Sequence, residues 1–161
     1  MPKLEFKEKM NLTLNYVLSR KIPVKEVFGN GKQVEMLQNW IKAKGYHIQG
    51  PLIMYSGGIK GTESDGTPIV ESKLLTQLKE GKIKAEYPYK FEQQIRLEKC
   101  LYVRFCDKKD RFQFASMELQ LYAYKNDVLL TGEMYTVLIE DKEIMIADVF
   151  MPVKQQEDAD E

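Results

Sequence analysis

Glu133 and Tyr135 stand two residues apart on a segment, residues 132–139, that predicts a β-strand. Because successive side chains of a strand point to opposite faces, this carboxylate and this phenol share one face. Val137 continues that face, and the opposite face is also mostly apolar, which places the strand inside a sheet. A carboxylate and a phenol on a largely buried strand indicate either a binding or acid–base site or a satisfied polar pair.

This strand forms the first half of a predicted hairpin, with a turn at residues 140–143 and a second apolar strand at 144–151 followed by Pro152 and Val153. The rest of the chain contains the elements that must position it. Alternating and helical apolar spacings predict strands at 10–23, 50–55 and 87–107 and helices at 32–44 and 112–126. Residues 69–78 fit either a strand or a short helix, and the polar, glycine-rich residues 56–66 predict a loop.

The composition predicts one globular domain. The chain has 161 residues, 43% of them hydrophobic and 30% charged, and its 24 basic residues balance 24 acidic ones. That balance argues against nucleic acid as a partner, and no apolar run approaches the length of a membrane span. The mixed-charge N-terminus does not resemble a signal peptide, so we expect a cytoplasmic protein. Cys100 and Cys106, six residues apart on one strand, are predicted to be free thiols.

The order strand, helix, strand, strand occurs twice. Adding 82 to Leu37, Trp40, Ile41 and Gly50 gives Leu119, Tyr122, Ala123 and Gly132, and adding 80 to Tyr55 gives Tyr135. We therefore expect two pseudo-repeats, about 10–80 and 85–153, that together form a single α+β domain over residues 10–153. The predicted fold is a curved, mostly antiparallel sheet with two helices on one face and a central cleft between the halves. Residues 1–9 would be a lead-in, and 154–161 an acidic disordered tail.

The long predicted strand supplies further candidates. From Ile95 its odd positions are mainly apolar and suit the core, whereas its even positions are polar and aromatic at once, which is unusual for a solvent-exposed face. These even positions are Arg96, Glu98, Cys100, Tyr102, Arg104 and Cys106. Arg96 or Arg104, which lie on this face, could pair with Glu133, and the Glu133 carboxylate would then be a structural ion pair rather than a free charge.

Several of these features resemble the GyrI-like family, the effector-binding domain that is appended to AraC-type and MerR-type regulators. The resemblance rests on Gly132, the sequence Glu133-Met134-Tyr135 and the closing run from Asp148 to Pro152-Val153. The first half matches through Trp40, Gly45, Gly50-Pro51 and Tyr55, so that the resemblance covers roughly residues 10 to 153. The chain lacks the Asp-Pro that usually follows the Glu-x-Tyr strand, and it has Asp148 where the family commonly has Glu.

The resemblance implies a cleft that takes hydrophobic, often cationic, small molecules above a carboxylate and between aromatic walls. An apolar cation that loses its hydration needs a buried negative charge and ring faces in exchange. Glu133 would supply the charge if no arginine neutralises it, and Asp148 would be either a second cleft acid or a solvent-exposed charge. The candidate ligand-binding residues are Glu133, Tyr135, Tyr55, Tyr102, Arg104, Glu98, Phe150 and Asp148.

Three functions remain open from the sequence. The first is a stand-alone protein that binds a small amphipathic or hydrophobic molecule in the cleft. The second is a protein-interaction module that binds or inhibits a partner protein. The third, ranked last because no nucleophile–base–orienter trio is visible, is a hydrolase that uses Glu133 and Tyr135 as base and acid. We expect no enzyme activity, no cofactor and no metal, since His47 has no second histidine and no cysteine cluster beside it.

Overall fold

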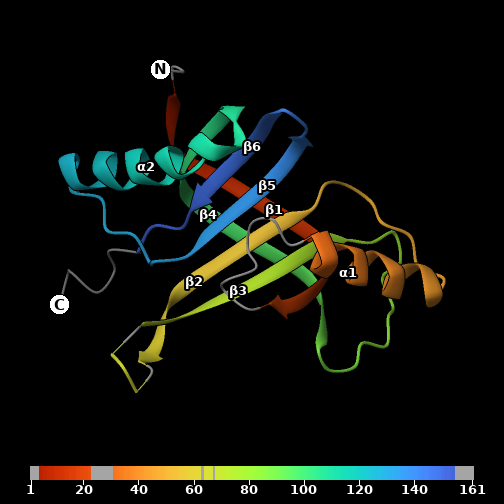
Figure 1. Ribbon diagram of the computed structural model, residues 1–161. Helices are drawn as coiled ribbons and strands as arrows, with labels where there is room; N and C mark the ends of the chain where they lie inside the picture. Colours follow the sequence, from red (N-terminus) through yellow and green to blue (C-terminus); the bar gives the residue numbers. More distant parts are fainter. Residues whose placement is uncertain (1–3, 23–30, 63, 67, 155–161) are drawn as a thin grey trace.

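The computed structural model describes residues 4–22, 31–62, 64–66 and 68–154. Six strands, two α-helices and one 3-10 helix follow each other along this part of the chain (Figure 1). In order they are β1 (Glu5–Ile22), α1 (Gly31–Ala43), β2 (Ile53–Thr62), β3 (Pro68–Gln77), β4 (Tyr89–Lys108), η2 (Lys109–Arg111), α2 (Gln113–Lys125), β5 (Met134–Asp141) and β6 (Ile144–Met151). The segment 23–30, which includes most of the predicted turn before α1, and the tail residues 155–161 lie outside the described residues.

All strand pairs are antiparallel, and the strands close into a ring in the order β1-β3-β2-β5-β6-β4. The long strands β1 and β4 pair with each other and close it. The prediction of an α+β fold with a mostly antiparallel sheet and two helices is therefore confirmed, and the curvature goes as far as closing the sheet into a ring, which the sequence did not predict. Closure removes unpaired backbone groups that an open edge would expose.

Each helix packs on the outer side of this ring. Helix α2 buries Leu119 and its neighbours against alternate residues of β4 and β6, and α1 buries Leu37 and Ile41 against β1 and β3. The strand residues that alternate with these helix-facing residues point to the opposite side of the sheet. They form a third cluster, which we call the central cluster. Its buried members are Leu14, Val17, Ile53, Tyr55, Leu75, Cys100, Tyr135, Val137 and Phe150.

Several strand boundaries differ from the sequence-based predictions; β5, for example, begins at Met134, so that Glu133 precedes it. Strand β1 begins at Glu5, inside the expected lead-in, because residues 5–7 pair with β4. The predicted loop 56–66 is wrong in its first part, since β2 continues to Thr62 and pairs with β3. Of residues 69–78, which fitted a strand or a helix, all but Leu78 belong to β3, and Leu78 forms an isolated bridge with Ile48. In each case the pairing uses backbone hydrogen bonds, which do not depend on the side chains that suggested a loop or a lead-in.

A bulge in β4 changes which of its residues face the central cluster. Lys99 has a φ of 58°, and the register with β1 shifts near it. A bulge adds one residue to one strand and so reverses the alternation beyond it. Before the bulge Leu97 faces the central cluster; after it Cys100 and Tyr102 do, while Leu101 packs under α2. Beyond Lys99, the odd-numbered residues of β4 are buried as predicted, but they pack under α2 on the outer side of the ring. The even-numbered Cys100 and Tyr102 face the central cluster instead.

The internal repeat is present in the hydrogen bonds as well as in the element order. Gly50 and Gly132, 82 residues apart, both have a positive φ, of 106° and 95°. Gln49 N donates to Gln77 O at 2.7 Å, and Thr131 N, 82 residues after Gln49, donates to Pro152 O at 3.1 Å. The strand pairings follow the same order in both halves: β1 pairs with β3 and β3 with β2, as β4 pairs with β6 and β6 with β5.

Candidate functional site

Four aromatic side chains lie in register across four neighbouring strands. Tyr55 of β2 pairs with Tyr135 of β5, Tyr135 pairs with Phe150 of β6, and Phe150 pairs with Tyr102 of β4. All four face the central cluster. The ring centroids of Tyr55 and Tyr135 are 5.0 Å apart in an edge-to-face arrangement, and those of Tyr102 and Phe150 are 5.0 Å apart and tilted. We call these four residues the aromatic row.

Glu133 lies at the Tyr55 end of the aromatic row. Its Oε2 accepts a hydrogen bond of 2.7 Å from the Tyr55 hydroxyl, and its backbone N–H donates to Thr131 Oγ1 at 3.2 Å. Neither candidate arginine neutralises it: Arg96 Nη2 lies 3.1 Å from Glu98 Oε1, and Arg104 binds another carboxylate. Within the described residues, Glu133 has no basic side chain within ion-pair distance.

Asp148 lies at the other end and is fully paired. Arg104 donates from Nε to Oδ1 at 2.7 Å and from Nη2 to Oδ2 at 3.0 Å, and the Tyr102 hydroxyl donates to Oδ1 at 2.7 Å. The Asp148 side chain is only 15% exposed, so it is not the solvent charge that was one of its two predicted roles. Burial alone would raise the pKa of Asp148, but the hydrogen bonds from Arg104 and Tyr102 outweigh it and lower that pKa.

The phenols of the aromatic row stay protonated at neutral pH. Burial, then the hydrogen bond to Glu133 and its negative charge, raise the pKa of Tyr55 well above its ordinary value. Burial and the charges of Glu133 and Glu92 do the same to the pKa of Tyr135, and burial with Asp148 raises that of Tyr102 to about 12. The aromatic row is therefore electrically neutral. It lies between Glu133, which has no basic partner, and Asp148, which is paired with Arg104.

Lys73 of β3 completes the surroundings of Tyr55. The two residues pair in register, and Lys73 Nζ lies 5.0 Å from the centroid of the Tyr55 ring. This lysine also lies 3.4 Å from Glu71 Oε1, and Glu71 pairs in addition with Lys21. The face of the Tyr55 ring is thus already in contact with a cation inside the protein.

A cavity of about 350 Å³ lies beside Glu133. Helix α2 contributes Ser116 and Gln120 to its wall, and the rest comes from β2, from the end of β6 and from the start of β5 with the segment just before it. Its lining residues are Ser56, Ser116, Gln120, Leu130, Gly132, Glu133, Met134 and Met151. Glu133 therefore contacts the aromatic row on one side and a cavity on the other.

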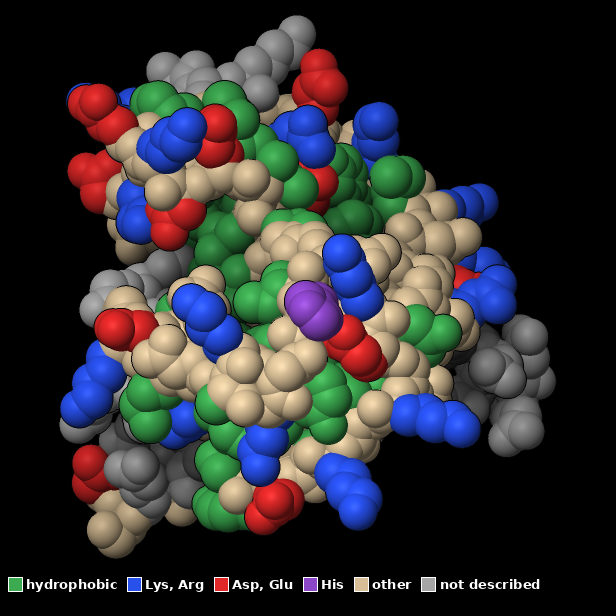
Figure 2. Space-filling view, turned by 90° about the vertical axis from the view of Figure 1, so that its right-hand side faces the viewer, with side chains coloured by type: hydrophobic (Ala, Val, Ile, Leu, Met, Phe, Trp, Pro, Cys, Tyr) green, Lys and Arg blue, Asp and Glu red, His purple; other side chains and the backbone are tan. Residues whose placement is uncertain are grey.

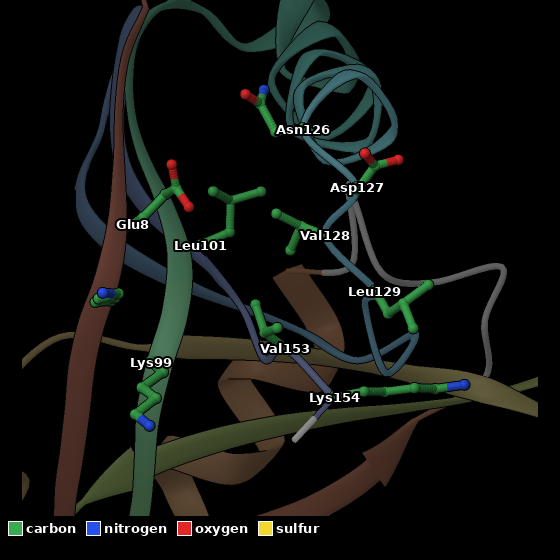
Figure 3. Close-up of a pocket in the computed structure, with 10 residues that line it drawn as sticks. Glu8, Lys99, Leu101, Asn126, Asp127, Val128, Leu129, Val153 and Lys154 are labelled. Carbon is green, nitrogen blue, oxygen red and sulfur yellow. The ribbon is translucent and has the colours of Figure 1, made fainter. Parts of the chain in front are cut away.

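A second cavity, of about 340 Å³, lies at the C-terminal end of α2 (Figure 3). Leu101, Val128 and Val153 form its apolar part, and the side chains of Lys99 and Lys154 extend away from it. None of the predicted site residues lines this cavity. His47, the purple side chain in Figure 2, lies elsewhere on the surface, where its Nδ1 is 2.8 Å from Glu80 Oε2. No group of three or more potential metal ligands occurs among the described residues.

The structure divides the predicted site residues into two neighbouring groups. Glu133, Tyr55 and Tyr135 are in contact at one end of the aromatic row, and Tyr102, Phe150, Asp148 and Arg104 are in contact at the other. Glu98 belongs to neither group, because it is exposed and pairs with Arg96. Sequence reasoning missed Lys73 and Thr131. Alternation along residues 69–78 would have placed Lys73 on one face with Leu75, but nothing in the sequence paired that face with Tyr55.

Comparison with known proteins supports the fold. No protein-family model and no curated protein sequence matches the chain. Among solved structures, the C-terminal domain of EcmrR superposes with a TM-score of 0.63 at 16% identity, covering 95% of this chain and 98% of that domain. EcmrR in a complex with DNA superposes with a TM-score of 0.64 at 16% identity, and this match spans only 57% of the EcmrR chain.

Two further structures share the fold at lower scores. SAV2435 bound to tetraphenylphosphonium superposes with a TM-score of 0.51 at 15% identity, covering 98% of this chain and 97% of that one. A hydrolase from Listeria innocua gives 0.50 at 8% identity, covering 94% and 92%. No helix in the described part of the chain is long and apolar enough to span a bilayer. The resemblance drawn from the sequence is confirmed for the fold: this chain has the GyrI-like effector-binding fold.

Proposed function

We propose that this protein binds a small lipophilic cation between Glu133 and the aromatic row. The observation that carries the proposal is the carboxylate of Glu133, which has no basic partner among the described residues and lies at one end of four aligned aromatic side chains, bonded to Tyr55. A carboxylate in a partly buried position is costly unless it is paired or well hydrogen-bonded. A cationic ligand would supply the missing positive charge.

The aromatic row would provide the apolar contacts. Tyr55 and Tyr135 are 6% and 7% exposed and meet edge to face, so a ligand would gain contact with their ring faces by separating the two rings. At the opposite end, Arg104 neutralises Asp148, which leaves Glu133 as the acid available to a ligand.

The cavity beside Glu133 supports a small molecule as the ligand. Its volume of about 350 Å³ lies near the lower limit of the roughly 300–1,000 Å³ found for ligand pockets. SAV2435, which shares the fold, was solved with tetraphenylphosphonium, an apolar cation. That compound is therefore a suitable first probe for this chain.

We propose binding rather than catalysis as the function. The single histidine of the chain, His47, pairs with Glu80 and not with any residue of the aromatic row. Cys100 faces the central cluster, but burial raises its pKa to about 11, which keeps the thiol protonated and poorly nucleophilic. A glutamate and a tyrosine without a positioned nucleophile favour holding a ligand over cleaving one.

A thermal-shift titration with tetraphenylphosphonium tests the proposal. A ligand that binds only the folded protein at a hundredfold excess over its dissociation constant adds about 2.7 kcal/mol to the free energy of unfolding, so the midpoint must rise. We expect this rise in the parent and in Glu35→Gln, which alters an exposed acid of α1, and its loss in Glu133→Gln. A flat titration of the parent, or an equal rise in Glu133→Gln, would contradict the proposal.

A further inference from the structure

Two different surroundings meet at the carboxylate of Glu133. Its Oε2 is bonded to the Tyr55 hydroxyl on the side of the aromatic row, where Tyr55 and Tyr135 are 6% and 7% exposed. Its Oε1 accepts, from the described residues, only a long hydrogen bond of 3.5 Å from Thr131 Oγ1. Glu133 also lines the cavity of about 350 Å³ beside α2. A cation in that cavity can therefore reach Glu133 without separating the packed rings.

The wall of this cavity is apolar where strands β5 and β6 form it. Met134 and Met151 lie on the helix-facing side of the sheet, whereas Tyr135, next to Met134 in the chain, lies on the other side. Leu130 also lines the cavity and packs against the same helix-facing cluster. Methionine side chains are unbranched and flexible, so they adapt to apolar groups of different shape. These three side chains can contact the hydrocarbon part of a small ligand.

The remaining wall supplies neutral hydrogen-bond acceptors beside the charge of Glu133. Gln120 Nε2 donates to Ser116 Oγ at 3.1 Å, which leaves the side-chain carbonyl oxygen of Gln120 as an acceptor. Within the described part of the chain, neither this oxygen nor the Ser56 hydroxyl has a hydrogen-bond partner. No lysine, arginine or histidine is among the described residues that line the cavity. The cavity therefore presents one negative charge and two neutral acceptors.

We propose that this cavity is a site for the protonated amino group of a small amphipathic primary amine. An alkylammonium has three N–H donors, as the side chain of lysine has, and it stays charged at neutral pH. Glu133, Gln120 and Ser56 supply one acceptor for each donor, and the hydrocarbon part of the amine packs against Met134 and Met151. The hydrogen bond to Glu133 joins two charged groups and is the strongest of the three.

Hydrogen-bond donors, in addition to charge, define the class of ligand that fits the cavity. A quaternary ammonium has the same charge as a primary one but no N–H group, so it leaves Gln120 and Ser56 without donors. A site that hydrogen-bonds the N–H groups of its ligand discriminates against an analogue that lacks them. This selectivity goes beyond the lipophilic cation of the proposed function, on which it rests in one respect, since Glu133 is the anion for both ligands.

Isothermal titration with phenethylammonium and phenethyltrimethylammonium tests this selectivity, because both probes carry one positive charge on the same phenethyl group. We expect the parent to bind phenethylammonium at least about tenfold more tightly than the trimethyl probe. Gln120→Leu should weaken the binding of phenethylammonium about tenfold and leave the affinity for the trimethyl probe unchanged. Gln113→Leu is the matched control and should keep the preference, because Gln113 is an exposed residue of the same helix outside the cavity.

Tetraphenylphosphonium, which has no N–H donor, separates the amine site from the proposed function. If the parent binds phenethylammonium with the expected preference but does not bind tetraphenylphosphonium, the amine site stands and the lipophilic-cation site fails. If the parent binds tetraphenylphosphonium but does not bind phenethylammonium, or binds both ammonium probes equally, the amine site is overturned and the lipophilic-cation site stands. A preference for phenethylammonium that survives in Gln120→Leu would overturn the amine site as well.

Discussion

Tyr55 and Tyr135 face each other directly across β2 and β5, with ring centroids 5.0 Å apart. The two residues are 80 positions apart, which is the offset that relates the two halves at this point. Despite this symmetry, their hydroxyls differ. Tyr55 donates to Glu133, whereas Tyr135 makes no hydrogen bond to the described residues. Within the described part of the chain, a carboxylate is therefore bonded to Tyr55 but not to Tyr135.

This difference predicts unequal effects of two matched substitutions. Tyr55→Phe removes the donor to Glu133 and should lower the free energy of unfolding by about 1–2 kcal/mol, as expected for a hydrogen bond to a charged group. Tyr135→Phe removes a hydroxyl without such a bond and should change it by less than about 0.5 kcal/mol. Urea unfolding of both variants measures the difference. Equal losses would show that the Tyr55–Glu133 bond does not stabilise the fold.

The repeated glycines predict a second matched series. Gly50 and Gly132 adopt a φ of 106° and 95°, a region that residues with a Cβ atom rarely enter. Replacement of either by alanine should cost about 1–2 kcal/mol of unfolding free energy. Gly31→Ala serves as the control, because a Cβ atom there meets nothing within 4 Å and its φ is not positive. If thermal melts showed that Gly50→Ala and Gly31→Ala are equally stable, the positive φ of Gly50 would not require glycine, and the prediction would be wrong.

The paired Asp148 predicts a pH-dependent contribution to stability. Its pKa is lowered in the folded state, so the ionised carboxylate stabilises the fold above its unfolded pKa of about 3.9, and this contribution is lost as the pH falls through the folded pKa. Asp148→Asn should therefore be about 1–2 kcal/mol less stable than the parent near pH 7. The difference should shrink below about pH 4. Unfolding measured from pH 7 to pH 3 tests this, and a constant difference over the whole range would contradict it.

Local pattern predicted the helices, the repeated order of elements and the strand that contains Tyr135, because these depend on residues close in sequence; Glu133, which was placed in that strand, precedes it. The helix predicted at 32–44 lies within one residue of α1, with Gly45 in a left-handed conformation after it. The equivalence of Gly50 and Gly132 could be found from spacing alone, since the same backbone conformation requires the same residue. These features are local in the chain or repeated within it.

Features that depend on contacts between distant strands could not be predicted in this way. The continuation of β2 through a glycine-rich segment requires β3 beside it, and the bulge at Lys99 depends on the pairing of β4 with β1. The sequence also left Arg104 equally able to pair with Glu133 or with another acid. Only the register between β4 and β6, which places Arg104 opposite Asp148, decides that Glu133 stays without an arginine.

The most direct test of the central claim compares two ligands of the same shape and opposite charge. Isothermal titration of the parent with tetraphenylphosphonium and with tetraphenylborate separates the contribution of charge from that of apolar contact. If Glu133 is the anchor, the phosphonium binds at least about tenfold more tightly than the borate, a difference of about 1.4 kcal/mol, and Glu133→Gln removes the preference while Glu35→Gln keeps it. Equal affinity of the parent for both ions, or a preference that survives in Glu133→Gln, would contradict the account.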